Sequence, residues 1–313
     1  MHVIVITGPT ASGKSALALA VAERLGCGII SADSRQVYRH IPITTAIPSY
    51  EERLRVPHYL IEFLELEETY SAAKFAEDAL KIINESSKKG DKYIIVCGGS
   101  MMYIDALLYG LDDFPQISST VRKRVNEMYE QIGIEGLLAY LQNLDPLSFS
   151  TVDMANPRRV IHKIELCLQA GKPISGIISG TFKDQSSVNG STFVHKIKDT
   201  GHTYSKYMIE MHRDILFERI NARVEWMVIH GMEDEARKVF DKHELNSLNT
   251  IGFKEWFANF DGLLDRHTAI ERIKKNTRVY AKKQLTWLAK QRDVIRINHD
   301  RIEKMSDFII KHL

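Results

Sequence analysis

The chain has 313 residues, 44% of them hydrophobic and 26% charged, which is the composition of an ordinary globular protein without extensive disorder. Its formal net charge of +2 gives no reason to expect nucleic-acid binding by the whole chain, because only clustered charge produces a useful field. Cys27, Cys97 and Cys167 form no C-x-x-C pair, so neither a disulfide framework nor a zinc ribbon is suggested.

The sequence gives no sign of a membrane or export segment. No run approaches the ~18 apolar residues of a membrane helix, and the N-terminal run MHVIVIT is too short for a signal peptide. We therefore expect a cytoplasmic protein without a membrane segment.

The first part of the chain alternates short apolar runs with helical patterns. Residues 3–7, 28–31 and 92–97 predict strands, and residues 3–7 are continuous and β-branched, as in a strand buried on both faces. Helical spacing over residues 15–25 and 72–87 places helices between these strands. Such βα units predict an α/β fold in which helices flank a doubly wound parallel sheet.

The middle of the chain, residues 113–201, predicts a mainly helical insertion that ends in a polar loop or connector over residues 179–201. The core domain is then expected to comprise residues 1–112 and 202–313. Helices are predicted in the insertion over residues 121–131, 136–142 and 157–170, and in the later core over residues 214–230, 233–243 and 268–290, after a strand over residues 203–211.

The loop after the first predicted strand satisfies the pattern G-x-x-x-x-G-K-[ST] between a strand and a helix. There, backbone N–H groups and the helix N-terminus can hold phosphate oxygens. Lys14 supplies a cation and Ser15 a hydroxyl that can hold Mg²⁺. The core is therefore expected to resemble P-loop NTPases and to bind a polyphosphate through Gly8, Pro9, Thr10, Ala11, Ser12, Gly13, Lys14 and Ser15.

A P-loop NTPase normally carries an acidic residue at the end of another strand, where it helps to hold Mg²⁺. The predicted strand 92–97 instead runs into Gly98, Gly99 and Ser100. The missing carboxylate weakens the expectation of ATP hydrolysis, although small kinases can also lack it. The two glycines suggest a close approach of the backbone to a ligand.

Asp33 follows the second predicted strand in the segment SADSRQVY, at the carboxyl edge of the sheet where α/β proteins bind ligands. It could act there as a general base, or it could cap the following turn. The residues alone leave both interpretations open.

Nine sequence blocks are spread along nearly the whole chain: GPTASGKS, SADSRQVY, VPHYLIE, YSAAKF, GGSMMYIDALLYG, NPRRVIHKIE, ERINARVEWM, LNTIGFKE and NTRVYAKKQLTWL. In sequence and in order, these blocks resemble the tRNA dimethylallyltransferases. SADSRQVY and YAKKQLTW are quite specific to this family. The resemblance implies transfer of a dimethylallyl group from dimethylallyl diphosphate to N6 of the adenosine 3′-adjacent to the anticodon (position 37), in tRNAs reading codons that begin with U.

The same resemblance implies catalytic roles for individual side chains. Asp33 would take a proton from the amine, while Lys14, Ser15 with Mg²⁺, and Arg223 would neutralise the departing diphosphate. Ser100 would contribute a hydroxyl near the amine or the diphosphate.

Residues 271–296 carry nine basic side chains against Glu271 and Asp293. This excess could bind a phosphate backbone, and Tyr280 and Trp287 could stack on unpaired bases. A solvated amphipathic helix would show a similar pattern, so both interpretations stay open on the residues alone.

The resemblance implies a tRNA partner whose target base is unstacked into a channel, while the helical insertion clamps the anticodon stem. We expect the protein to act as a monomer. The residues expected to contact tRNA are Asp33, Ser34, Arg35, Gln36, Arg158, Arg159, His162, Asn249, Lys254, Lys283, Gln284 and Trp287.

Two blocks depart from the family pattern. The common G-T-A-K-P is Thr44-Thr45-Ala46-Ile47-Pro48 here, and a frequent arginine is His162, which puts fine contacts near the substrate entrance in doubt. No C-terminal zinc-finger pattern occurs, so a bacterial-type enzyme is expected. The alternatives are a small-molecule or nucleotide kinase, a prenyltransferase acting on free AMP, and an RNA-binding protein with a vestigial nucleotide site.

Overall fold

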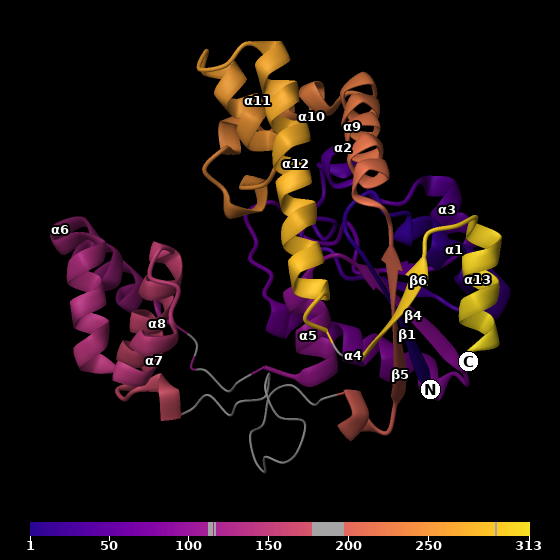
Figure 1. The fold of residues 1–313 in the computed structure, drawn as a ribbon, viewed down its shortest axis with the longest axis horizontal. Helices are drawn as coiled ribbons and strands as arrows, with labels where there is room; N and C mark the ends of the chain where they lie inside the picture. Colours follow the sequence, from indigo (N-terminus) through magenta and orange to yellow (C-terminus); the bar gives the residue numbers. More distant parts are fainter. Residues whose placement is uncertain (112–114, 116, 177–196, 292) are drawn as a thin grey trace. The chain divides into compact units, whose positions relative to one another are not determined.

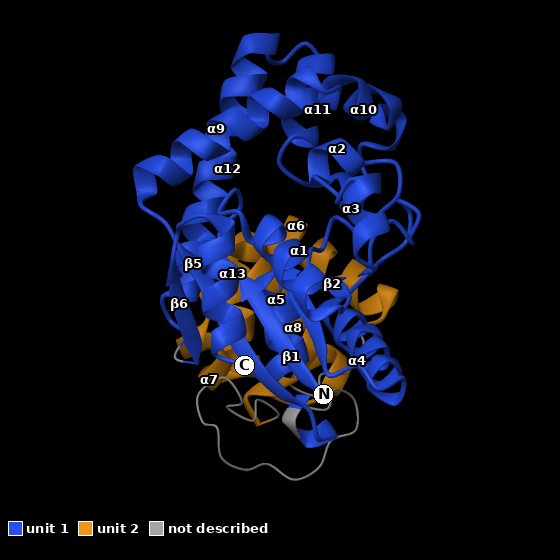
Figure 2. Ribbon diagram, turned by 90° about the vertical axis from the view of Figure 1, so that its right-hand side faces the viewer, with its two compact units in different colours: residues 1–108, 194–313 blue, residues 109–193 orange. Residues whose placement is uncertain are grey.

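The computed structural model describes residues 1–111, 115, 117–176, 197–291 and 293–313. The chain divides into two compact units, unit 1 with residues 1–108 and 194–313, and unit 2 with residues 109–193 (Figure 2). Most of the predicted connector, residues 179–201, lies outside the described residues. Within those that are described, no helix has the length and apolar character needed to cross a membrane.

The described strands of unit 1 form one six-stranded parallel sheet in the order β3-β2-β4-β1-β5-β6 (Figure 1). This arrangement confirms the predicted α/β core with a parallel sheet. The strands β2, β3 and β4 lie on one side of β1, and β5 and β6 lie on the other. The chain connections therefore change direction at β1, and such a change leaves a crevice at the carboxyl end of the strand, where sheets of this kind bind ligands. The strands are β1 His2–Thr7, β2 Ile29–Ser31, β3 His58–Tyr59, β4 Tyr93–Gly98, β5 Thr203–Glu210 and β6 Val294–Asn298.

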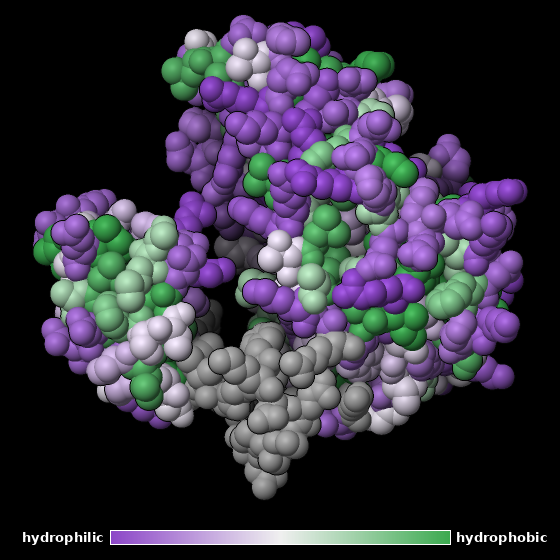
Figure 3. All heavy atoms as spheres, in the orientation of Figure 1, coloured by the Kyte–Doolittle hydropathy of each residue, from purple (hydrophilic) through white to green (hydrophobic). Residues whose placement is uncertain are grey.

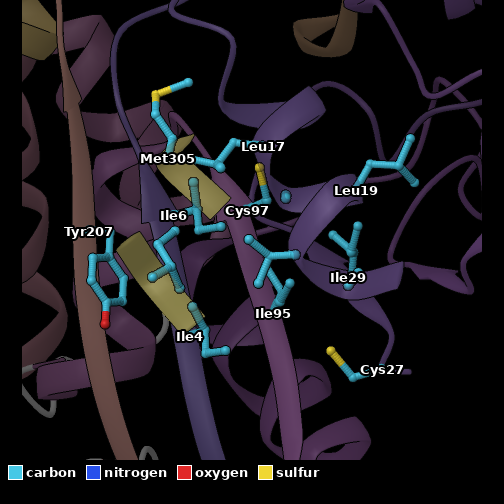
Figure 4. Packing of buried hydrophobic residues seen from close by; sticks show 14 of the residues in the cluster. Ile4, Ile6, Leu17, Leu19, Cys27, Ile29, Ile95, Cys97, Tyr207 and Met305 are labelled. Carbon is cyan, nitrogen blue, oxygen red and sulfur yellow. The ribbon is translucent and has the colours of Figure 1, made fainter. Parts of the chain in front are cut away.

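Helices cover both faces of this sheet. Ile4 and Ile6 of β1 pack with Leu17 and Met305, which come from the helices α1 and α13 (Figure 4). Successive side chains of a strand alternate between its two faces, so the fully buried Val3 and Val5 pack on the opposite side of the sheet. The helices of this unit are α1 Lys14–Leu25, α2 Pro42–Thr45, α3 Tyr50–Arg55, α4 Ala72–Lys88, α5 Met101–Tyr109, α9 Arg213–Ile229, α10 Met232–Lys238, α11 Phe253–Phe260, α12 Arg266–Leu288 and α13 Ile302–Lys311.

Unit 2 is a helical lobe with a core of its own. It contains α6 Ser119–Leu144, α7 Pro146–Thr151 and α8 Pro157–Ala170. α6 is interrupted at Gly133, whose φ of 64° and ψ of −170° are not helical, so the two predicted helices lie on either side of it. The core consists of Val125, Leu137, Leu141, Val160 and Ile164.

Candidate active site

The P-loop forms the turn between β1 and α1. Gly13 has a φ of 93°, in the left-handed region that favours glycine, and α1 begins at the next residue, Lys14. The first N–H groups of α1 have no intrahelical partner, so they and the helix dipole favour an anion at this point. Lys14 Nζ donates a hydrogen bond to Pro9 O at 3.3 Å, which folds the ammonium group over the loop.

A cavity of about 340 Å³ opens on this loop, and we call this cavity with its lining residues the phosphate cradle. Lys14, Arg219 and Arg223 bring three cations to it, and Arg219 Nε donates to Ala11 O at 2.8 Å. Burial lowers the pKa of both Lys14 and Arg223, and the charge of Asp33 opposes that shift at each. An anion in this cavity would stabilise all three cations. The cavity is lined by Ala11, Gly13, Lys14, Ser15, Ala16, Arg219, Ala222 and Arg223.

A larger cavity of about 530 Å³ adjoins the first. Its walls combine Asp33 and Thr10 with apolar side chains such as Met227 and Ile273, and with Tyr280 of α12. Burial, and then the nearby charge of Asp33, raises the pKa of Tyr280 to about 12. Because Arg223 lines both cavities, a molecule in one would meet a molecule in the other beside this guanidinium.

Asp33 lies just beyond β2, at the carboxyl edge of the sheet. Its Oδ1 accepts a hydrogen bond from Arg35 N at 2.9 Å, so the carboxylate does cap its own turn. It also lines the larger cavity, and no hydrogen bond from a described residue engages its Oδ2. The arrangement therefore leaves one oxygen available to a molecule in that cavity.

The turn after β4 supports the Asp33 loop. Ser34 N donates to Ser100 Oγ at 2.9 Å, and Ser100 N donates to Ala32 O at 3.1 Å. A Cβ on Gly98 would lie 2.1 Å from Ala32 O, and one on Gly99 would lie 2.4 Å from Gln284 Nε2. The close approach that these glycines predict is thus made to the protein itself rather than to a ligand.

The residues at the end of β4 offer no carboxylate for a metal. Burial raises the pKa of Cys97 to about 11, even though Lys14 opposes the shift. Across the described residues, no group of three or more His, Cys, Asp and Glu side chains could hold a metal ion. Ser15 is an exposed residue of the loop, and its hydroxyl is a group that suits Mg²⁺, which commonly takes its other ligands from waters and substrate phosphates.

The structure gathers part of the predicted tRNA-contacting set around the larger cavity. Asn249, Lys254 and Lys283 line it together with Asp33, Ser34 and Arg35. The face of α12 visible in Figure 3 is largely hydrophilic. The exposed lysines and arginines that the structure describes in and just after this helix are Arg266, Arg272, Lys275, Lys282, Lys283 and Lys290.

Other members of the predicted set make contacts within the protein. Gln36 Nε2 donates to Thr45 O and Ala46 O, and Trp287 Nε1 donates to Asp105 Oδ2 at 3.1 Å. Gln284 is buried. Arg158, Arg159 and His162 lie exposed on α8, which belongs to unit 2.

Sequence reasoning missed Arg219 as a residue of the cradle. It stands one helical turn before Arg223 on α9, so the i, i+4 spacing places both guanidinium groups on one face. That spacing was visible in the segment ERINARV and could have identified the second cation.

This chain is similar to known proteins over nearly its whole length. The protein-family model described as "IPP transferase" matches residues 36–291. A tRNA dimethylallyltransferase of Porphyromonas gingivalis is 41% identical over 300 residues, with 96% of this chain and 94% of the relative covered. One from Phocaeicola vulgatus is 39% identical over 306 residues, with 98% and 97% covered.

Solved structures show the same fold. The tRNA isopentenylpyrophosphate transferase of Bacillus halodurans superposes with a TM-score of 0.69 at 30% identity, and the match covers 99% of this chain and 96% of that one. A eukaryotic dimethylallyltransferase acting on tRNA gives a TM-score of 0.79 at 24% identity, over 99% of this chain and 77% of that one. The sequence matches extend over both units, and this chain belongs to the IPP transferase family.

Proposed function

We propose that this protein transfers a dimethylallyl group from dimethylallyl diphosphate to N6 of the adenosine 3′-adjacent to the anticodon of tRNA (position 37). The observation that carries the proposal is that Arg223 lines both the phosphate cradle and the cavity that contains Asp33. A diphosphate held by Lys14 and an adenine presented to Asp33 would therefore meet beside one guanidinium.

The reaction needs one bond to form and one to break. The N6 lone pair attacks the allylic carbon that bears the diphosphate, the C–O bond breaks, and the electron pair leaves with diphosphate. Asp33 accepts the N6 proton, which restores a neutral amine. Lys14, Arg219 and Arg223 stabilise the negative charge that develops on the leaving group.

The cradle suits Mg²⁺ as the cofactor. Ser15 would supply its protein ligand, and the diphosphate oxygens and waters the remainder, as is common for this ion. The bound ion would neutralise part of the charge on the diphosphate.

The acceptor is proposed to be tRNA, because the relatives are named for tRNA and because basic side chains are exposed on α12 and α8. Both cavities are lined by residues of unit 1 in a single chain, which supports action as a monomer. Substrate tRNAs that read codons beginning with U, and a cytoplasmic location, follow from the family resemblance and complete the proposal.

A transfer assay tests this function. The protein is incubated with Mg²⁺, labelled dimethylallyl diphosphate and one acceptor, which is unmodified tRNA, AMP or ATP. We expect label in tRNA at the adenosine 3′ of the anticodon. Label in AMP but not in tRNA would overturn the acceptor, and phosphorylation or ATP hydrolysis without prenyl transfer would overturn the reaction.

A further inference from the structure

We propose that Gln284 is a positioning residue that fixes the P-loop against the loop that carries Asp33, an inference that rests on the proposed function. Gln284 projects from α12 and is only 2% exposed. Its Oε1 accepts a hydrogen bond from Thr10 N at 2.8 Å, and its Nε2 donates to Gly99 O at 3.0 Å. One side chain thereby joins the phosphate cradle to the turn after β4.

The connection continues from Gly99 to the base. Ser100 is the next residue, its Oγ accepts the hydrogen bond from Ser34 N, and Ser34 follows Asp33 directly. The contact between Gly99 and Gln284 leaves no room for a Cβ. A displaced Gln284 amide would therefore allow the cradle and the Asp33 loop to shift relative to each other.

The same geometry argues against a direct tRNA contact by Gln284. Both polar ends of its amide are already paired with backbone groups, and the side chain is buried. Its neighbour Lys283 is exposed and lines the larger cavity, so it is the better placed of the two to meet RNA.

Positioning matters here because the two substrates occupy different cavities. Bond formation requires the reacting atoms to approach within about 3–3.5 Å, and a misplacement of about 1 Å can cost about 10²-fold in rate. Loss of the Gln284 bridge should therefore slow the chemical step while both substrates still bind.

The experiment compares Gln284→Met, which removes both hydrogen bonds at nearly constant volume, with Gln284→Glu, which keeps the acceptor and loses the donor. Three quantities are measured: the single-turnover rate at saturating dimethylallyl diphosphate and tRNA, the Kd for tRNA, and the Kd for inorganic pyrophosphate with Mg²⁺. Thr286→Val, exposed on the same helix, is the control and should keep the wild-type rate.

We expect Gln284→Met to lower the single-turnover rate by about 10²-fold and to leave the tRNA Kd within about twofold of wild type. Gln284→Glu should also slow the reaction and should weaken pyrophosphate binding, because it adds a negative charge beside the cradle. In wild type the Thr10 amide should exchange its hydrogen slowly, and Gln284→Met should speed that exchange.

Three results would overturn the assignment. A tRNA Kd raised about tenfold with an unchanged saturated rate would make Gln284 an RNA contact. A wild-type rate in the Met and Glu variants, or failure of both to fold, would also contradict a positioning role. If wild-type protein transferred no prenyl group, the proposed function would fail, whereas Thr10 exchange would still report on the bridge.

Discussion

Asp33 combines a structural and a chemical task in one carboxylate. Oδ1 holds the turn by accepting the Arg35 amide, and the side chain lines the larger cavity. The cap restricts the rotation of the carboxylate, so the group that would act as base is held in place before a substrate arrives.

Asparagine and alanine separate these two tasks. Asp33→Asn keeps an oxygen for the cap but loses basicity, so we expect a rate lower by about 10²–10⁴-fold with the turn and pyrophosphate binding retained. Asp33→Ala should lose the rate and also about 1 kcal/mol of stability. Single-turnover kinetics and thermal unfolding measure the two effects, and near-normal turnover of the Asn variant would rule out Asp33 as the base.

The two arginines of α9 differ in the cavities that they reach. Arg223 lines both, so Arg223→Met should lower the saturated transfer rate by about 10²–10³-fold, as expected for a group that stabilises a departing anion. Arg219 lines the cradle alone, so Arg219→Met should mainly raise KM for dimethylallyl diphosphate. Steady-state kinetics distinguishes the two, and equal effects of both variants on KM alone would contradict this division.

Asp105 on α5 is a buried carboxylate that destabilises the folded state when ionised. Its Oδ2 accepts from Trp287, its Oδ1 has no partner among the described residues, and burial raises its pKa to about 6. The raised pKa contributes stability that is fully present below about pH 4 and is lost as the pH rises through 6.

Asp105→Asn should therefore raise stability at pH 7 by about 1–2 kcal/mol, less than the full shift implies because solvent screens part of the charge. The variant should also flatten the change in Tm between pH 4 and 6. Thermal unfolding across this range checks both, and a variant less stable than wild type at pH 7 would contradict the expectation.

At the level of elements, the sequence predicts those parts whose pattern has a local cause. The β-branched run of β1, the P-loop and the helices α1, α4, α8 and α12 lie within a few residues of their predicted places. The predicted helix over residues 233–243 is α10 followed by a 3₁₀ turn, Phe240–Lys242.

The missed elements depend on tertiary contacts. β6 is an edge strand that pairs with β5 alone, and only one of its residues is buried. The other missed element, α13, is a short amphipathic helix. The contacts of Gln284 and Trp287 within the protein could not be predicted either. When the partners of a polar side chain in a basic helix are unknown, a contact with RNA is the natural expectation.

The basic N-terminal part of α8 allows a test of RNA binding by unit 2. Arg158→Ala with Arg159→Ala should raise the tRNA KM about tenfold and lower the salt dependence of tRNA binding by about two ions, since each lost phosphate contact removes about one. The saturated rate should not change. The matched control removes Lys81 and Lys88, exposed on α4. If both double variants weakened tRNA binding equally, the effect would come from the change in net charge and not from a contact made by α8.

At the scale of the whole molecule, ligand binding at the cradle should stabilise unit 1. Inorganic pyrophosphate with Mg²⁺ at about 100 times Kd should add about 2.7 kcal/mol to the free energy of unfolding and raise Tm. EDTA should remove most of this shift if the ion takes part, and Lys14→Met should remove it in either case. A shift of equal size in Lys14→Met would mean that the anion binds elsewhere.

The pairing of β1 with β5 joins the two segments of the chain that build unit 1. During synthesis, β1 and its P-loop emerge before unit 2, and β5 follows only after residues 109–193 of unit 2. Until then one edge of β1 has no strand to pair with, and the nascent chain presents an open sheet edge. The phosphate-binding loop therefore stays at an incomplete sheet during synthesis until residues 203–210 have emerged and paired with β1.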